Sequence, residues 1–205
     1  MKKHPSIVTR VREAVLVTSW LYSRPIGPAD GETHLPAEPF VIRRATDTDL
    51  ARMATDLGGE LTPAKATAIR ARHARTDMEV FVAALPDGEV SGYGHTQYGW
   101  IDDAHYCLDL GAYPGVAHLF DDYVARAYRG HGLQAALIRA RLAAAHERGS
   151  RRATILVADS NHASRASVRR SGFAPALRVI TLRAGRRNLS RAIGSTRLLA
   201  GQGSA

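Results

Sequence analysis

The sequence predicts an α/β protein of the α+β kind, in which helices flank one central sheet. Its 205 residues, 45% of them apolar, suffice for a single good core. Runs with strand and helix periodicity alternate along the chain. A strand, a glycine-bearing turn and a helix start follow one another directly within residues 116–137. No stretch approaches about 18 consecutive apolar residues, so we expect no membrane span.

Residues 1–38 are expected to be an extension that precedes the domain. Three valines at positions 8, 11 and 15 are spaced as on one helix face, which predicts an amphipathic helix over residues 6–22. The three prolines and two glycines of residues 23–38 predict a linker. The domain itself is expected over residues 39–183, and a basic tail over residues 184–205.

The first half of the domain is expected to combine short helices with strands. Thr46 or Asp47 is a good N-cap, and Pro63 suits the first turn of a helix. The turn Pro86-Asp87-Gly88 predicts a hairpin. The expected elements are a strand over residues 40–43, helices over 47–57 and 63–75, and hairpin strands over 79–85 and 90–97.

The second half of the domain is expected to begin with a long connection over residues 99–115. The near-continuous apolar run over residues 153–158 is typical of a strand buried on both faces. Gly149 and Gly172 each mark the end of a helix. The remaining expected elements are strands over residues 116–124 and 176–183, helices over 133–149 and 161–171, and a helical stretch over 188–199.

The charge of the chain is unevenly distributed. Residues 126–205 contain 16 arginines and two acidic residues, a net charge of +14, whereas residues 1–125 carry −5, which together give +9. A strongly positive half attracts polyanions. Either a coenzyme with several phosphates or a nucleic acid meets that description.

The single cysteine, Cys107, limits the compartment and the chemistry. It excludes an internal disulfide framework and any multi-cysteine zinc site. Residues 15–22 are too polar for the apolar region of a signal peptide. We therefore expect a cytoplasmic protein that binds no metal.

Residues 129–134, Arg-Gly-His-Gly-Leu-Gln, carry the strongest functional signal. They follow a strand and open a helix, whose first amides lack partners within the helix and whose dipole is positive at that end. Gly130 and Gly132 have no Cβ, so phosphate oxygens can approach the backbone, and Arg129 can add a charged contact. The stretch alone fits a phosphate site and a plain surface turn about equally well.

Two motifs together resemble the GCN5-related N-acetyltransferase (GNAT) superfamily. Residues 129–134 match its coenzyme-A signature, Arg/Gln-x-x-Gly-x-Gly/Ala, at five of six positions, with Gln134 where the family usually has Gly or Ala. Asn161, Ser164 and Gly172-Phe173 look like its second element, Asn-x-x-Ala/Ser followed by Gly-Phe. The resemblance covers about residues 40–183. It implies a mixed, mostly antiparallel sheet that is splayed between its fourth and fifth strands.

The resemblance also implies where acetyl-CoA, or another acyl-CoA, would lie as co-substrate. Its pantetheine arm would lie between the splayed strands, and the Val124 amide would polarise the thioester carbonyl. The pyrophosphate would lie on the glycine turn, and Asn161 would contact the pantetheine or a structured water near it. The implied coenzyme-binding residues are Tyr123, Val124, Arg129, Gly130, His131, Gly132, Leu133, Gln134, Asn161 and Ser164.

Acyl transfer to an amine also needs a group that removes a proton from the amine. The candidate bases are His118, Asp121 and Asp122, with His95 a weaker candidate and a water chain as the alternative. The family often protonates the leaving thiolate with a tyrosine seven residues after the motif asparagine, but Val168 stands there. Ser164, Ser167 or water would have to replace it. The aromatic and acidic residues of 99–115 suit a cationic acceptor, or else form a solvated loop.

Three functions remain open at this point. The first is an N-acyltransferase that moves an acyl group from acyl-CoA to a primary amine of a small molecule or peptide. The second is an acyltransferase of the same fold whose donor is an aminoacyl-tRNA, which the arginine-rich half motivates. The third is a noncatalytic module that binds anions or RNA. Homodimers are common on this fold, so a homodimer is also open.

Overall fold

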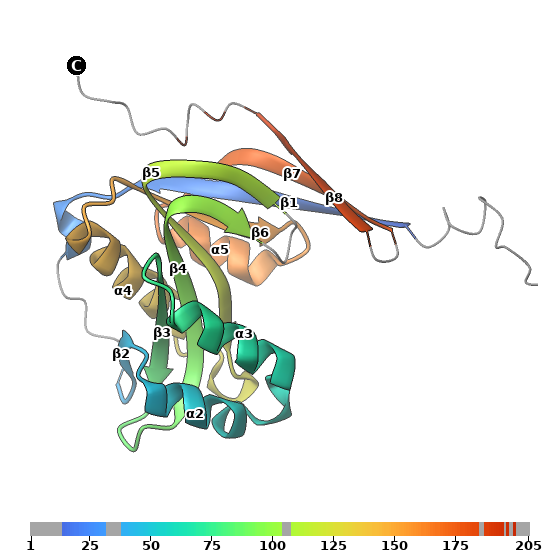
Figure 1. Ribbon diagram of the computed structural model, residues 1–205. Coiled ribbons are helices and arrows are strands. Elements are labelled where there is room, and N and C mark those ends of the chain that lie inside the picture. Colours follow the sequence, from blue (N-terminus) through green and yellow to red (C-terminus); the bar gives the residue numbers. More distant parts are fainter. Residues whose placement is uncertain are drawn as a thin grey trace, which may run out of the picture.

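A computed structural model describes residues 14–31, 38–103, 108–184 and 187–194, with residues 196 and 199. Eight strands form one mixed sheet in the order β2-β3-β4-β5-β6-β1-β7-β8, and four α-helices pack on it (Figure 1). Only the β5–β6 pair is parallel among these strand pairs, which confirms the expected mixed, mostly antiparallel sheet. No helix in the described part of the chain is long and apolar enough to cross a membrane.

The bounds of the elements follow the chain order. The strands are β1 (Ala14–Pro25), β2 (Val41–Arg44), β3 (Met78–Ala84), β4 (Val90–Asp103), β5 (Leu108–Val124), β6 (Arg152–Ala158), β7 (Ala174–Ala184) and β8 (Arg187–Ile193). The α-helices are α2 (Asp47–Asp56), α3 (Pro63–His73), α4 (Leu133–Glu147) and α5 (His162–Arg170). Short 3₁₀ turns lie at Pro28–Gly31 (η1), Gly58–Glu60 (η2) and Arg126–Tyr128 (η3).

The helices divide between the two faces of the sheet. Side chains of β3 alternate, so that Val80 and Val82 pack against α2 and α3 while Phe81 and Ala83 pack against α4. Helix α5 lies on the same face as α4, because Val168 shares a buried cluster with Ile138 and Leu142 of α4. A ligand that contacts both α3 and α4 must therefore reach through the sheet.

Strand β1 corrects the helix expected over residues 6–22. Residues 14–25 form a strand that pairs with β6 on one side and β7 on the other. Leu21 and Tyr22 are fully buried, so the segment is apolar on both faces and shows no strand alternation. Residues 6–13 lie outside the described residues. The division at residue 38 stays a prediction, although β1 shares the sheet of the main domain.

The helical stretch expected over residues 188–199 is also wrong where the structure describes it. Residues 187–193 form β8, which pairs antiparallel with β7 and is the last strand of the sheet. The expected start of the tail at residue 184 remains a prediction. Arg191, the basic residue of this region whose side chain the structure describes, therefore lies on an edge strand.

The connection expected over residues 99–115 is instead the far half of a long hairpin. Trp100 pairs with Ala112 and Asp102 with Asp109, so β4 and β5 remain paired as far as Asp103 and Leu108. Residues 104–107, and with them Cys107, lie outside the described residues. The hairpin covers the β1–β7 end of the sheet, where Ile101 and Leu108 share a buried cluster with Leu21 (Figure 1).

The sheet opens between β5 and β6, as expected. Their parallel pairing runs from Val116–Arg152 to Leu119–Ile155 and stops there. Beyond Leu119, strand β5 continues to Val124 beside β4 alone. The backbone of β5 therefore has an unpaired side where it approaches the glycine turn.

Candidate active site

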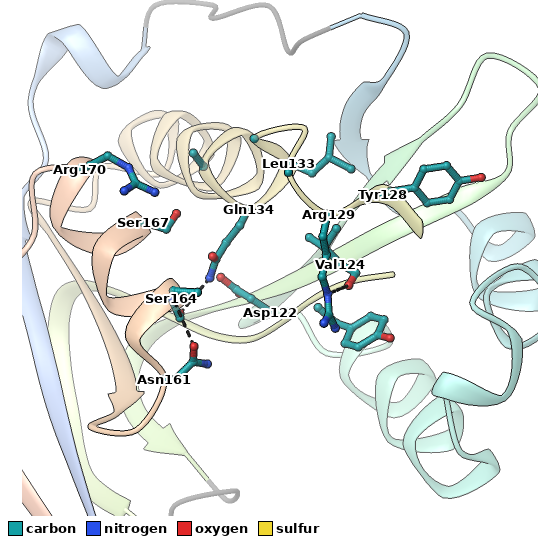
Figure 2. A pocket seen from close by; sticks show the side chains of 15 residues that line it. Asp122, Val124, Tyr128, Arg129, Leu133, Gln134, Asn161, Ser164, Ser167 and Arg170 are labelled. Atoms are coloured by element: carbon teal, nitrogen blue, oxygen red, sulfur yellow. Dashed lines mark hydrogen bonds between the residues drawn. The ribbon is translucent and has the colours of Figure 1, made fainter. Parts of the chain in front are cut away.

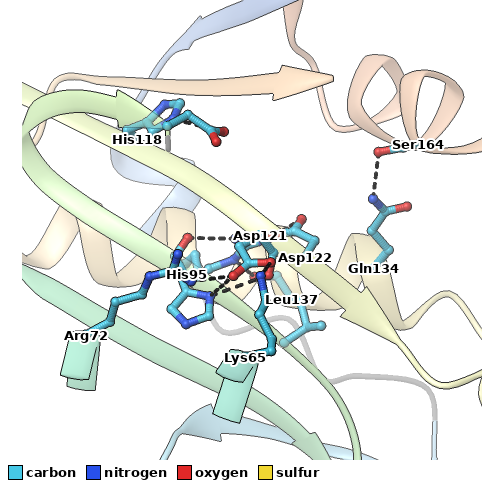
Figure 3. Close-up of polar contacts among 11 residues, drawn as sticks. Lys65, Arg72, His95, His118, Asp121, Asp122, Gln134, Leu137 and Ser164 are labelled. Atoms are coloured by element: carbon cyan, nitrogen blue, oxygen red, sulfur yellow. Dashed lines mark hydrogen bonds and ion pairs between the residues drawn. The ribbon is translucent and has the colours of Figure 1, made fainter. Parts of the chain in front are cut away.

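Strand β5 carries a bulge at the start of this opening. Phe120 pairs with His95 and Tyr123 pairs with Tyr93, so two residues of β5 oppose one residue of β4. Asp121 has a φ of 54°, in the left-handed region that few residues other than glycine adopt. The bulge sends two consecutive carboxylates to opposite faces of the sheet, Asp121 toward α3 and Asp122 toward α4 (Figure 3).

Asp122 is held by a buried arginine of α4. The Arg141 Nη1 and Nη2 donate to Asp122 Oδ1 and Oδ2 at 2.6 and 2.8 Å, and Nη1 also donates to the His95 carbonyl at 3.0 Å. Burial raises the pKa of the Asp122 carboxyl and the Arg141 charge opposes it. A carboxylate whose two oxygens are both bound by one guanidinium fixes the bulge and is poorly placed to act as a base.

Asp121 is neutralised from the other face. Lys65 Nζ lies 2.5 Å from Asp121 Oδ1, and Arg72 donates to Oδ2. Burial raises the pKa of Asp121, but the cationic Lys65 and Arg72 oppose it, and the pKa stays below its ordinary value. Burial lowers the pKa of His95 to about 3, so its ring is neutral at working pH. Both groups are therefore weak proton acceptors.

His118 is buried behind the site. Its Nδ1 lies 2.9 Å from Thr154 Oγ1, its Nε2 lies 3.9 Å from Asp103 Oδ2, and its ring stacks on Phe120. The side chain is fully buried and lines neither of the cavities described below. The structure therefore brings Asp121 and Asp122 to the opening and leaves His118 one layer beneath it.

A cavity of about 730 Å³, here named the donor cavity, lies where β5 and β6 part (Figure 2). All of the expected coenzyme-binding residues except His131 line it. His131 is exposed and its ring packs near Phe40. The cavity is lined by Asp122, Tyr123, Val124, Tyr128, Arg129, Gly130, Gly132, Leu133, Gln134, Ala135, Asn161, Ala163, Ser164, Ser167 and Arg170.

The glycine turn leaves the start of α4 open toward this cavity. Gly132 is the N-cap, and its position supplies no capping side chain. Gly130 and Gly132 have φ values of 88° and 74°, while a Cβ added at either would meet nothing within 4 Å. The turn therefore needs glycine for its backbone conformation, and the space beside it is free. Uncapped amides facing a cavity make a site for an anion.

The direction of the Val124 amide follows from the hydrogen bonds of its neighbours. The Ala125 N–H donates to the Ser91 carbonyl of β4 at 2.9 Å, so Ala125 and Tyr123 face β4. By alternation Val124 faces the opening, and its carbonyl accepts from Arg129 Nε at 3.2 Å on that side. The Val124 amide therefore points toward the opening, as its expected role requires.

A second cavity of about 470 Å³, here named the acceptor cavity, lies beside α3. Its aromatic lining is Tyr93, Phe120 and Tyr123, and its charged lining is Glu60, Lys65, Arg72, Asp103, Asp121 and Asp122. It shares Asp122, Tyr123, Gln134, Asn161 and Ser164 with the donor cavity. The two cavities thus meet at the opening between β5 and β6, which we call the junction.

Helix α5 lines one side of the junction. Asn161 caps this helix, since its Oδ1 accepts from the Ser164 N–H at 3.1 Å, and Gln134 Nε2 of α4 donates to Ser164 Oγ at 3.0 Å. Val168 is fully buried in the core and lines neither cavity. Its position thus supplies no hydroxyl and faces away from the junction.

Several residues of the site were missed in the sequence. Lys65 and Arg72 lie on α3, far from both motifs along the chain, and Arg170 lies within the second motif at a position that its pattern does not specify. Arg141 left a signal, because it lies four residues after Leu137 on an otherwise apolar helix face. A buried arginine is costly unless it is paired, so its position on this helix face predicts a buried carboxylate nearby.

These features define an α/β protein with an anion cradle and two cavities that share a wall where the sheet opens between β5 and β6. The family model described as the acetyltransferase (GNAT) family matches residues 48–173. The chain belongs to this family, and it is a GNAT-type N-acyltransferase. No curated protein matches the chain in sequence.

Solved structures show the same fold at low sequence identity. A Drosophila protein is 17% identical with a TM-score of 0.58, over 86% of this chain and 57% of that one. AAC(6')-Iy, bound to the bisubstrate analogue CoA-S-monomethyl-acetylneamine, is 19% identical with a TM-score of 0.51, over 66% and 90%. A Novosphingobium aromaticivorans protein assigned to the GNAT family is 18% identical with a TM-score of 0.56, over 82% and 65%.

Proposed function

We propose that the protein transfers an acetyl or other acyl group from acyl-CoA to a primary amine of a small molecule or peptide. The observation that carries the proposal is the junction of two cavities at the unpaired side of β5. One cavity ends in an anion cradle and the other is lined by aromatic and carboxylate groups. A donor with a diphosphate and a separate amine acceptor meet only at this junction.

The donor cavity fits a coenzyme with several phosphates. The open amides of α4 and the Arg129 and Arg170 side chains suit the diphosphate. The unpaired side of β5 suits an extended arm with amide groups, which would add to the sheet as a further strand. AAC(6')-Iy binds a CoA bisubstrate analogue on the same fold.

In the reaction the amine nitrogen attacks the thioester carbonyl carbon. The N–C bond forms, the C–S bond breaks, the nitrogen loses a proton and the thiolate leaves. The Val124 amide donates to the carbonyl oxygen, where negative charge develops. Because Asp121, Asp122 and His118 are held in ion pairs or buried, we propose that the proton leaves through water in the acceptor cavity.

The acceptor cavity favours a cationic amine. Its carboxylates outnumber its cations, even when Asp122, whose charge is matched by Arg141, is left out. Its aromatic residues present ring faces suited to an ammonium or an apolar body. The comparison that tests the donor is a thermal shift with acetyl-CoA against bulk tRNA, followed by thiol release with a panel of primary amines.

Each outcome separates the three functions. Acetyl-CoA is expected to raise the melting temperature, and Gly132→Trp to abolish that shift. A shift with tRNA alone, weakening by orders of magnitude between about 50 and 200 mM salt, together with amine turnover from an aminoacyl-tRNA, would establish the tRNA donor instead. Binding without turnover of any amine would leave a noncatalytic module.

A further inference from the structure

The junction between the two cavities is crossed by one hydrogen bond. Gln134 lies in the first turn of α4 and Ser164 in the first turn of α5, on either side of the opening. Gln134 Nε2 donates to Ser164 Oγ at 3.0 Å, and both residues line both cavities (Figure 2). The bond therefore spans the passage from the donor cavity to the acceptor cavity.

The two partners are fixed to different degrees. The Ser164 N–H is held by the Asn161 carboxamide at 3.1 Å, and its short side chain has one rotatable bond. Gln134 reaches across on three rotatable bonds, and within the described residues its amide bonds only to Ser164. Rotation of the Gln134 side chain alone is therefore enough to break the bond, with no movement of either helix.

A smaller side chain would leave the passage open. The position of Gln134 needs no glutamine for folding, because the helix start is set by Gly132 and Leu133 packs into the core. An alanine here would contribute no atom that reaches Ser164. The fold therefore does not require glutamine here, and the bond to Ser164 is the contact that distinguishes it from a smaller residue.

We propose that the Gln134–Ser164 bond is a latch that closes the passage between the two cavities until the arm of the acyl donor displaces it. The inference rests on the proposed function, because the donor must extend from the cradle to the acceptor cavity. The bond forms in the free protein and opposes donor entry. It keeps the acceptor cavity separate while no donor is bound.

The latch has a measurable cost to donor affinity. Breaking one intramolecular hydrogen bond before binding weakens affinity by about two- to ten-fold, the range of one net hydrogen bond. Gln134→Ala, Gln134→Asn and Ser164→Ala are each expected to bind CoA tighter by that factor. Asparagine keeps the amide but is one methylene too short to reach across. Because the bond is lost only once, the double variant gains no more than either single one.

A fragment of the donor separates the latch from the cradle. The compound 3′-phospho-ADP carries the phosphates of CoA and lacks the arm, so it never crosses the junction. Isothermal titration should give the same dissociation constant for 3′-phospho-ADP with the parent protein, Gln134→Ala and Ser164→Ala. Ser160→Ala, an exposed change next to the cap, is the matched control and should alter neither ligand.

Each other outcome decides between alternatives. Equal tightening of CoA and 3′-phospho-ADP would place the effect of Gln134 on the cradle and overturn the latch. Weaker CoA binding by the Gln134 variants would make the amide a contact for the donor. Unchanged CoA binding in every variant would also refute the latch. Failure of all proteins to bind either ligand would instead remove the proposed function on which the latch rests.

Discussion

Arg141 of α4 and Asp122 of β5 form a two-pronged ion pair in the interior, with N–O distances of 2.6 and 2.8 Å. Arg141 is fully buried, and its Nε and Nη1 also bind the carbonyls of Leu137 and His95. A Cβ at Gly94 would lie 2.8 Å from the Arg141 Cζ, so the strand next to the bulge is shaped to admit the guanidinium. This pair ties the helix that carries the anion cradle to the strand that carries the Val124 amide.

Removing one partner of this pair is expected to destabilise the fold strongly. Arg141→Met leaves the Asp122 carboxylate buried without its cation, which costs about 3–5 kcal/mol. The double variant Arg141→Met with Asp122→Asn removes both charges and should recover part of that loss. Urea unfolding of the single and double variants measures the difference. Equal loss in the two proteins would show that packing, and not the unpaired charge, is responsible.

The glycines of the turn are expected to be required for their backbone conformation, and not because an added Cβ would clash. Gly132→Ala forces a residue with a Cβ into a φ of 74°, which costs about 1–2 kcal/mol of unfolding free energy. Gly27→Ala is the matched control, because its added Cβ also meets nothing within 4 Å and its φ is not left-handed. Chemical denaturation of both variants tests this. Similar losses would mean that the φ of Gly132 is not what demands glycine.

Local patterns predicted the centre of the fold better than its edges. The strands near residues 79–85, 90–97 and 153–158 and the helices around both motifs were found, because each has a clear period or cap. Strand β1 was missed because it is buried on both faces at Leu21 and Tyr22 and lacks alternation. Its β-branched residues Val15, Val17 and Thr18 were the available signal.

The candidate site divides in the same way. The cradle was predicted because all of its residues lie within one short segment. The ion pairs that fix Asp121 and Asp122 were not, since Lys65, Arg72 and Arg141 approach from three places in the sequence. Only the topology shows that side chains of α3 and α4 form ion pairs with the β5 bulge from opposite faces of the sheet. The fold therefore changes the interpretation of Asp121 and Asp122 from candidate bases to carboxylates held in ion pairs.

Acid is expected to destabilise the protein through His95. Burial lowers its folded pKa to about 3 from an ordinary value of 6.5, so below pH 6.5 the unfolded chain binds more protons. Stability is then full above pH 6.5 and falls as the pH drops toward 3, by up to about 1.4 kcal/mol per pH unit. Unfolding free energies at pH 7, 6 and 5 measure the slope.

A variant isolates the contribution of His95 to this slope. Asp49, whose pKa is lowered to about 2 by Arg43 and Thr46 bonds that outweigh its burial, loses its stabilising effect only below its unfolded value of 3.8. Above pH 5 it does not contribute to the slope. His95→Gln should therefore flatten the dependence between pH 5 and 7, at a lower overall stability. An unchanged slope would assign the acid sensitivity to another group.

Arg170 is expected to contribute to donor affinity, and its neighbour Arg169 is not. Both are exposed at the end of α5, but only Arg170 lines the donor cavity, and it also lines an adjoining cavity of about 640 Å³ with Arg139. Within the described residues neither Arg139 nor Arg170 has an ion pair, so both charges are available to a ligand. An exposed charge contact is worth about 1 kcal/mol, so Arg170→Ala should weaken CoA binding about five-fold and Arg169→Ala should not.

Titration with 3′-dephospho-CoA tests which phosphate of the donor Arg170 contacts. If the phosphate at the 3′ position is what Arg170 contacts, the variant should bind both forms alike, whereas an equal loss for both forms would place the contact on the diphosphate.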